Sequence, residues 1–193
     1  MRIPSLALTT ALALAAALAN LSANAQTIHP ADHAGPVPAT QIVTSSATPA
    51  PLGLQIFCLR EPTHCAAAPA TALEMDQRLM NLLASVNREV NAAIRPRMRS
   101  TQVWELGAQT GDCKDYAMNK RAELIARGVP AGALRLAIGL TAQGEGHAVL
   151  IVRTTVGDYV LDNLTAQILP FNQTGHTLTA ISSPDPKRWN RVA

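Results

Sequence analysis

Aromatic residues are scarce in this 193-residue chain, which contains two Trp, two Tyr and two Phe. The 16 Lys and Arg residues barely outnumber the 13 Asp and Glu residues, and they are scattered along the sequence. Binding to nucleic acid typically requires clustered cations interleaved with aromatic side chains that stack on bases. The one dense basic stretch, residues 95–99, is more typical of a solvated loop. The composition therefore favours no nucleic-acid partner.

Beyond the N-terminus, no apolar run approaches the ~20 residues that a membrane span requires. The N-terminus carries Arg2, an Ala- and Leu-rich stretch over residues 6–21, and then Ala23-Asn24-Ala25. This order predicts a secretory signal peptide over residues 1–25, cleaved after Ala25, with a retained membrane anchor as the alternative. No lipid-attachment cysteine follows the cleavage site. We therefore expect a periplasmic or secreted product with no stable membrane insertion after signal cleavage.

Cysteine is also rare, and the three residues, Cys58, Cys65 and Cys113, leave one thiol without a partner in an oxidising compartment. Cys58 and Cys65 are seven positions apart, and Pro62 between them favours a turn that brings their sulfurs together. This spacing predicts a disulfide, which stabilises such a short loop by roughly 2 kcal/mol. A zinc site of Cys58, His64 and Cys65 is the alternative, but it lacks a fourth ligand.

Apolar periodicity divides the rest of the chain. Residues 26–52 are rich in Pro, Ala and Thr and nearly free of charge, which predicts a disordered linker before a domain over residues 53–193. The expected elements of that domain are helices over 71–95 and 112–127, a long loop over 96–111, strands over 134–140, 148–153, 159–164 and 167–171, and coil from residue 182. Helices followed by antiparallel strands indicate an α+β domain.

The unpaired Cys113 lies at the start of the second expected helix, within Gly111-Asp112-Cys113-Lys114-Asp115. Free backbone N–H groups and the helix dipole at this position favour the thiolate form. A buried, inert thiol is the alternative, although such residues usually have apolar neighbours and Cys113 is flanked by charge. We therefore interpret Cys113 as a reactive nucleophile.

A cysteine nucleophile requires a base and a group that orients the base. His147 is the best candidate base because it opens a strand after Gly146, whereas His176 lies in a polar segment and His64 lies inside the expected disulfide loop. Asp162 interrupts an apolar strand, where an unpaired charge is costly. Asp158 follows Gly157 and is explained by a turn.

Two hairpin registers place Asp162 differently. If the turn centres on residues 156–157, Asp162 lies four residues, or ~13 Å, from His147 along the strand. If the loop centres on residues 154–155, Asp162 lies directly opposite His147 with both side chains on one face. A Cys-His-Asp site therefore predicts the second register, or a bulge that mimics it.

Three motifs in this order resemble the bacterial transglutaminase-like cysteine proteinases: Trp104 with Gly111-Asp112-Cys113-Lys114-Asp115-Tyr116-Ala117, Gly146-His147-Ala148-Val149-Leu150, and Val160-Leu161-Asp162-Asn163-Leu164. The resemblance implies a papain-like, transglutaminase-type α+β fold with the nucleophile at a helix N-terminus packed on an antiparallel sheet. It also implies a triad of Cys113 as nucleophile, His147 as general base and Asp162 as orienting carboxylate. Trp104 then lines the site and helps the oxyanion region, with a plain core position as the alternative.

The resemblance extends to LapG-type periplasmic peptidases, which release a surface adhesin and depend on calcium bound beside the nucleophile. No cofactor is required for the cysteine chemistry itself. The LapG-type order is Gly-Asp-Cys-Glu-Asp, whereas this chain has Lys114, which removes an oxygen ligand and adds a repelling charge. Asp112 and Asp115 remain as the candidate calcium ligands. A regulatory membrane-protein partner follows from the same family analogy.

The leading hypothesis is an exported cysteine peptidase that hydrolyses a peptide bond in a protein or peptide substrate, by family analogy a surface adhesin. A transglutaminase-like acyl or amide transferase uses the same triad with an amine as acceptor. An exported binding module that kept the fold and lost the chemistry is a third alternative.

Overall fold

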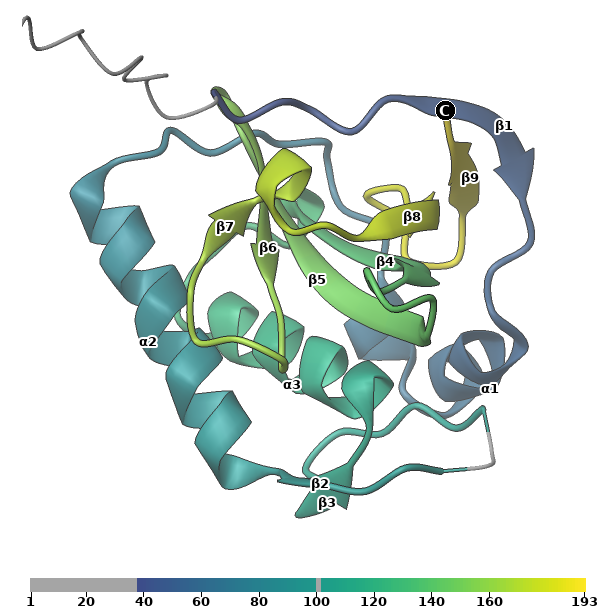
Figure 1. Cartoon of the computed structure of the whole chain (residues 1–193). Helices are drawn as coiled ribbons and strands as arrows, with labels where there is room; N and C mark the ends of the chain where they lie inside the picture. The colour runs from purple at the N-terminus through teal and green to yellow at the C-terminus, as the bar shows by residue number, and fades with distance from the viewer. Residues whose placement is uncertain (1–37, 100–101) are drawn as a thin grey trace, which may run out of the picture. The chain divides into compact units, whose positions relative to one another are not determined.

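Three α-helices and a seven-stranded antiparallel sheet make up the part of the chain described by the computed structural model, residues 38–99 and 102–193 (Figure 1). The predicted signal peptide, residues 1–25, lies outside the described residues, as do residues 26–37 of the predicted linker. Within the described ranges, no helix combines the length and hydropathy needed to cross a bilayer. The predicted α+β class is confirmed by this arrangement.

Apart from the strand Thr44–Thr48, the helices come before the strands of the main sheet, as expected. The helices are α1 (Leu52–Arg60), α2 (Gln77–Ala93) and α3 (Cys113–Ala126), with 3-10 turns η1 (Pro62–Cys65), η2 (Ala131–Ala133) and η3 (Phe171–Gln173). The sheet contains β1 (Thr44–Thr48), β4 (Leu134–Leu140), β5 (Gly146–Thr154), β6 (Gly157–Leu161), β7 (Leu169–Pro170), β8 (Thr177–Ser182) and β9 (Trp189–Val192), in the order β1-β9-β8-β4-β5-β6-β7. A separate parallel pair joins β2 (Arg95–Pro96) to β3 (Thr110–Gly111), inside the segment predicted as a long loop.

Helix α2 begins later than the apolar pattern predicts. Asp76 caps its first turn by accepting a hydrogen bond from the Leu79 N–H at 2.7 Å. Upstream, Leu73 is extended instead: its N–H donates to the Arg153 carbonyl at 3.0 Å, and its own carbonyl accepts from the Thr155 N–H at 2.9 Å. The apolar periodicity therefore identified the helix, but residues 71–76 at its expected start are not helical, because this segment pairs with the sheet.

Alternation along the strands divides the apolar side chains between the two faces of the sheet. On β5, Leu150 and Val152 join the large core that contains the buried faces of the helices. Val149 and Ile151 belong to a smaller cluster on the opposite face, which Ile42 from the N-terminal segment helps to cover. Strand β5 is consequently buried on both sides, which fits its continuous apolar sequence.

The described part of the predicted linker is ordered, so the expectation of disorder over residues 26–52 does not hold for it. Residues 44–48 form β1 and pair with β9, and α1 begins at Leu52. The Ile42 N–H donates to a carboxylate oxygen of Asp158 at 2.7 Å, and its carbonyl accepts from Arg153 at 3.2 Å. Asp158 is fully buried and ion-paired with Arg153 at 2.8 Å, so it holds this segment as well as following a turn.

The C-terminal residues also differ from the expected coil. Residues 189–192 form β9, which lies between β1 and β8, and Figure 1 shows the C-terminus beside β1. Trp189 is 2% exposed, and its indole N–H donates to the Pro186 carbonyl at 2.8 Å. A short strand anchored by one aromatic residue carries too little periodicity to be recognised in the sequence.

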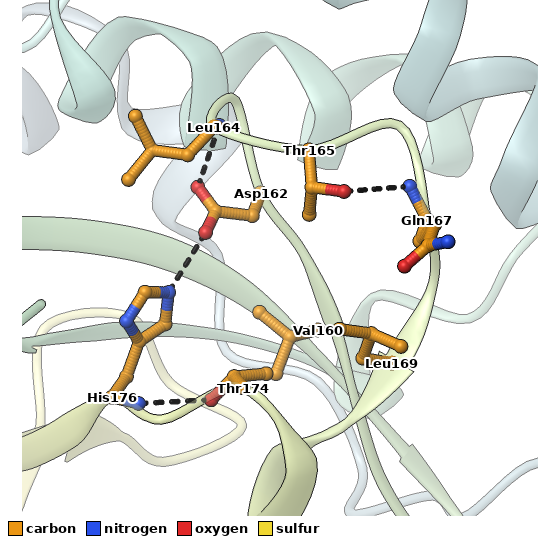
Figure 2. A pocket seen from close by; sticks show the side chains of 8 residues that line it. All are labelled: Val160, Asp162, Leu164, Thr165, Gln167, Leu169, Thr174 and His176. Carbon is orange, nitrogen blue, oxygen red and sulfur yellow. Dashed lines mark hydrogen bonds and ion pairs between the residues drawn. The ribbon is translucent and has the colours of Figure 1, made fainter. Parts of the chain in front are cut away.

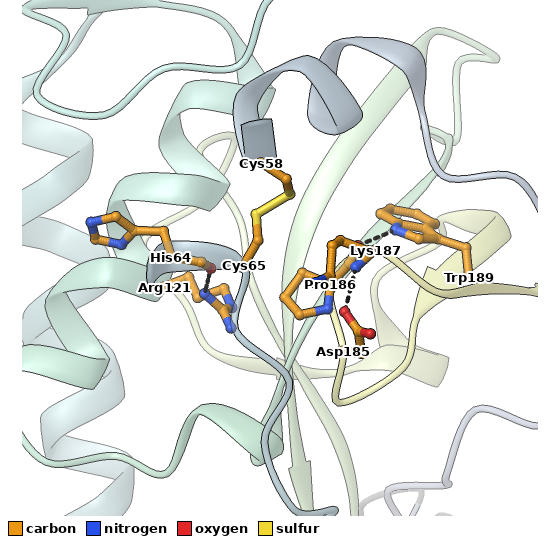
Figure 3. The surroundings of a disulfide bond; sticks show 8 residues. All are labelled: Cys58, His64, Cys65, Arg121, Asp185, Pro186, Lys187 and Trp189. Atoms are coloured by element: carbon orange, nitrogen blue, oxygen red, sulfur yellow. Dashed lines mark hydrogen bonds between the residues drawn. A yellow bond between two sulfur atoms is a disulfide. The ribbon is translucent and has the colours of Figure 1, made fainter. Parts of the chain in front are cut away.

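The predicted disulfide joins Cys58 at the end of α1 to Cys65 in η1, with the two Cα atoms 5.4 Å apart (Figure 3). Pro62 occupies the first position of η1, in agreement with the expected turn. Since both sulfurs are bonded to one another, the zinc alternative is excluded. Arg121 of α3 donates to the His64 carbonyl at 2.8 Å, which ties the disulfide loop to the helix that carries Cys113.

Candidate active site

Cys113 is the first residue of α3 and the one cysteine of the chain's three that is free. Asp112 caps the helix: it accepts the Lys114 N–H at 3.1 Å, and Asp115 reciprocates by accepting the Asp112 N–H at 3.0 Å. This capping box stops the helix from fraying at Cys113. The partly exposed Cys113 side chain therefore lies at a rigid helix N-terminus, where the backbone favours an anion.

His147 lies at the start of β5 and meets Asp162, which directly follows β6. Its Nε2 atom is 2.8 Å from Asp162 Oδ1, and its ring also hydrogen-bonds the Cys113 side chain. His147 is thus placed between a thiol and a carboxylate. The three residues predicted as nucleophile, base and orienting group come together at one point of the fold.

Neither of the two predicted hairpin registers is present. Leu150 pairs with Leu161 and Thr154 with Gly157, and no bulge interrupts the pairing between these two positions. Continuing this register places Asp162 opposite Val149, two residues from the position opposite His147. The contact is therefore diagonal, over a distance that two long side chains on the same face can span. The meeting of His147 and Asp162 was predicted, but the register behind it was wrong.

His176 is a fourth member of the site that sequence reasoning set aside. Its Nε2 atom is 2.8 Å from Asp162 Oδ2, and its ring centroid is 5.2 Å from that of His147. Gly139 on β4 makes this approach feasible, because it pairs with His147 on one side and a Cβ there would lie 2.2 Å from the Thr177 carbonyl oxygen. No sequence spacing signals this contact, which depends on β8 lying next to β4.

Electrostatics link these groups. Burial alone lowers the pKa of His147, but its hydrogen bonds with Asp162 and Cys113, and the charges of both, outweigh burial and raise the pKa to about 9. Burial raises the pKa of Asp162, yet hydrogen bonds from His147, His176 and the Leu164 N–H lower it well below its ordinary value. The arrangement therefore favours an imidazolium at His147 and a carboxylate at Asp162.

Lys120 places a further titratable group near Asp162. It follows Cys113 by seven residues on α3, is fully buried, and has no hydrogen-bond partner for Nζ among residues 38–99 and 102–193. Its ammonium lies 5.8 Å from the centroid of the Tyr116 ring. Burial lowers the pKa of Lys120 to about 7, and the charge of Asp162 opposes this shift. Lys120 was not among the residues predicted for the site, and its position two helical turns after Cys113 is the sequence signal that could have identified it.

A pocket of about 210 Å³ opens beside Asp162 and His176. Figure 2 shows these two side chains joined at one end of it, with Val160 and Leu169 along the floor. Its full lining consists of Val160, Asp162, Leu164, Thr165, Gln167, Leu169, Thr174 and His176. Cys113 and His147 are not part of this lining. The pocket therefore adjoins the carboxylate end of the site rather than the nucleophile.

Trp104, expected at the site or in the core, is 1% exposed and belongs to the large apolar core. The Cys113 side chain packs against this same core. Trp104 Nε1 is buried and has no hydrogen-bond partner within the described part of the chain. An unpaired buried donor is costly, and an acceptor supplied from outside the protein would remove that cost.

Asp112 and Asp115, the candidate calcium ligands, are both occupied by donors of the protein itself. Lys114 Nζ lies 2.6 Å from Asp112 Oδ2. Asp115 is fully buried and accepts the Glu105 N–H at 3.0 Å in addition to the Asp112 N–H, with Arg99 3.5 Å away. Calcium requires six to eight oxygen ligands, so these residues as placed do not fit the ion.

The second set of groups that could hold a metal is the cluster of His147, Asp162 and His176. One ligand atom each from His147, Asp162 and His176 lies within 4.8 Å of the others. Two imidazole nitrogens suit zinc or copper, whereas calcium prefers oxygen ligands. This cluster is therefore not a calcium site, and a metal bound there would occupy the base of the triad.

Three solved structures of LapG from Legionella pneumophila resemble the chain: calcium-bound LapG, LapG, and EGTA-treated LapG. Each is 22% identical, with a TM-score of 0.49 over 56% of this chain. The matched part spans 66%, 65% and 64% of those chains, so this chain covers less than two thirds of LapG. Among curated proteins, no sequence matches the chain.

The match to a family model covers more of the chain than these structures do, and it confirms the family that the three motifs predicted. The model of the bacterial transglutaminase-like cysteine proteinases, abbreviated BTLCP, matches residues 44–193. The match includes β1, in keeping with an ordered segment before residue 53, and it includes Cys113, His147 and Asp162. The chain belongs to the bacterial transglutaminase-like cysteine proteinase family.

Proposed function

We propose that this protein is an exported cysteine peptidase that hydrolyses a peptide bond with Cys113 as nucleophile, His147 as acid and base, and Asp162 as the orienting carboxylate. The observation that carries the proposal is the position of His147, hydrogen-bonded to the Cys113 side chain on one side and 2.8 Å from Asp162 on the other. A nucleophile, a base and an orienting group in contact are the signature of covalent catalysis.

The raised pKa of His147 supports an imidazolium as the resting state of this residue, and the mechanism we propose pairs it with the Cys113 thiolate. The Cys113 thiolate attacks the carbonyl carbon of the scissile bond, and His147 gives its proton to the departing amine, which leaves a thioester on Cys113. Neutral His147 then takes a proton from water as the water oxygen attacks the thioester. The acid product leaves, and the proton remains on His147 beside the regenerated thiolate.

Two residues have supporting roles in this proposal. His176 is a positioning residue: it holds the second oxygen of Asp162, so that the first stays directed at His147. Trp104 is the candidate donor for the oxyanion, because its indole N–H has no acceptor in residues 38–99 and 102–193; the N–H is buried, so this role requires the indole to become accessible when substrate binds. An oxyanion that develops on the substrate carbonyl would supply the missing acceptor.

The compartment and the substrate belong to the same proposal. The Cys58–Cys65 disulfide favours an oxidising compartment, in agreement with the signal peptide expected over residues 1–25. We place the mature protein in the periplasm or outside the cell. Its substrate is a protein, and a surface adhesin and a membrane-bound regulator are the choices that the family analogy favours.

The direct test measures alkylation of Cys113 by iodoacetamide between about pH 4 and pH 9 in the oxidised protein, where the other two cysteines are bonded. We expect fast alkylation below pH 7 and a decrease of at least about tenfold in His147→Ala. His64→Ala is the matched control, because His64 lies in the disulfide loop, where its ring centroid is 6.4 Å from that of Phe57. Equal rates in all three proteins would overturn the proposal.

A protein substrate then separates hydrolysis from acyl transfer. A peptidase releases two fragments with a new amino terminus and a new carboxylate, whether or not an added amine is present. Incorporation of a labelled amine into glutamine side chains, without cleavage, would instead identify a transferase that uses the same three residues.

A further inference from the structure

The residue after the nucleophile, Lys114, carries a positive charge into the first turn of α3. Helix dipoles make this an unfavourable position for a cation, because the N-terminus already bears partial positive charge. The Lys114 side chain is nevertheless 13% exposed and folds back on Asp112, with Nζ 2.6 Å from Oδ2. The energetic reason for the conformation must therefore be the carboxylate of Asp112, which is 7% exposed.

The second carboxylate of this turn is neutralised in the same way. Asp115 has no exposed side-chain surface, and Arg99 lies 3.5 Å from it while also bonding Glu105 at 2.7 Å. Gly111 packs directly against the Asp115 carboxylate, since a Cβ at Gly111 would lie 2.5 Å from Oδ2. No space remains on that side for an ion with its water ligands.

The four carboxylate oxygens of Asp112 and Asp115 therefore all face N–H donors. The donors are the Lys114 N–H and ammonium for Asp112, and the Glu105 and Asp112 N–H groups for Asp115. Glu105, the second partner of Arg99, adds a third acid, so the three acids and two bases of this turn carry one net negative charge. A divalent cation gains little here, because all four oxygens of Asp112 and Asp115 are already hydrogen-bonded.

We propose that the ammonium of Lys114 is the resident cation at this turn, occupying the position beside Asp112 that a divalent ion would need, so that the site forms without calcium. Calcium binds carboxylate oxygens at about 2.3 to 2.6 Å, and an ammonium at 2.6 Å from Oδ2 blocks that approach. The inference concerns the same site as the proposed peptidase function, but it makes a separate statement about ion binding.

The test uses calorimetric titration with calcium and thermal unfolding, neither of which depends on peptidase activity. For the unaltered protein we expect no binding heat, and a Tm in about 5 mM calcium that matches the Tm in EDTA within about 1 °C. If calcium binds at this site, a free calcium concentration of about a hundred times its Kd would raise the Tm by roughly 5 to 10 °C. Such a rise, or a one-to-one binding heat, would overturn the proposal even if the protein proves to be a peptidase.

Variants test the ammonium itself. Lys114→Met leaves Asp112 unpaired, so we expect its Tm in EDTA to fall by roughly 2 to 8 °C, with no recovery in calcium. Lys187→Met is the matched control, since Lys187 is exposed and far from α3 in the sequence. An equal Tm for both variants would overturn the role of Lys114.

Lys114→Glu adds an oxygen ligand at the position of the ammonium. We expect this variant to bind calcium and to regain thermal stability in its presence, whereas Lys187→Glu does not. A Lys114→Glu protein that ignores calcium would contradict the claim that the ammonium and the ion compete for one position. Alkylation of Cys113 in EDTA, measured on the same samples, reports separately on the nucleophile.

Discussion

His147 Nε2 and Asp162 Oδ1 are 2.8 Å apart although the backbone register places Asp162 opposite Val149 rather than opposite His147. The contact is diagonal across β5 and β6, and it is closed by the side chains alone. The side chains of His147 and Asp162 are 7% and 5% exposed. Since so little of either is in contact with solvent, water does not replace this hydrogen bond. The orientation of His147 consequently depends on this hydrogen bond, on its hydrogen bond with Cys113 and on what holds Asp162.

Asp162→Asn removes the negative charge that favours imidazolium at His147 while keeping the size of the side chain. We expect peptidase activity to fall by about 10² to 10⁴ and alkylation of Cys113 at neutral pH to slow at least tenfold, roughly as for loss of the base. Asp185→Asn, in a surface turn, is the control. Undiminished alkylation in Asp162→Asn would exclude Asp162 as the orienting group.

His176→Ala frees the second oxygen of Asp162 and leaves that carboxylate with one fewer donor. We expect a smaller loss of activity than for Asp162→Asn, roughly 10- to 100-fold in kcat with little change in KM. The reason is that His176 acts through Asp162 and not on the substrate. His176→Gln retains an N–H donor and should recover part of the rate. A purely structural His176 would show a lower Tm in both variants with no difference in kcat between them.

The pH dependence of stability isolates His147. Its pKa is raised from 6.5 to about 9 in the folded protein, so the protonated ring contributes stability that is complete below pH 6.5 and is lost as the pH rises through about 9. The difference in unfolding free energy between the unaltered protein and His147→Gln should decrease over that interval. Chemical denaturation at a series of pH values measures it, and a difference that grows with pH would reverse the assignment.

Trp104→Phe separates a donor from a core residue. Phenylalanine keeps most of the buried apolar surface and removes an N–H that lacks a partner in the described residues, so the Tm should change by no more than about 4 °C. If the N–H stabilises the oxyanion, kcat falls by about 10² to 10³ while iodoacetamide alkylation, which forms no oxyanion, is unaffected. Equal kcat in both proteins would assign Trp104 to the core alone.

Lys120→Met replaces a buried ammonium, which has no hydrogen-bond partner among the described residues, with an apolar side chain of similar length. Since the pKa of Lys120 is lowered from 10.5 to about 7, its burial costs stability fully below pH 7, and the cost disappears as the pH approaches 10.5. We expect the variant to have a higher Tm than the unaltered protein at pH 6 and a similar one near pH 10. A lower Tm at pH 6 would show that the ammonium has a partner it needs.

Features that depend on residues close together in the sequence could be predicted from the sequence. The apolar period identified α2, the Asp112 and Asp115 spacing is a capping box that starts α3 at Cys113, and the span from Cys58 to Cys65 closed as predicted. Each of these features involves residues within a few positions of one another, so short-range hydrogen bonds and packing suffice to specify them.

Contacts between segments far apart in the sequence could not be predicted in this way. The register of β5 and β6, the approach of His176 to Asp162 past Gly139, and the docking of Ile42 on Asp158 depend on which strands become neighbours. Strand pairing is chosen by the burial of whole faces, and no single residue carries that information. The sequence therefore indicates a nucleophile, a base and a carboxylate, while the packed sheet sets the distances at which they act.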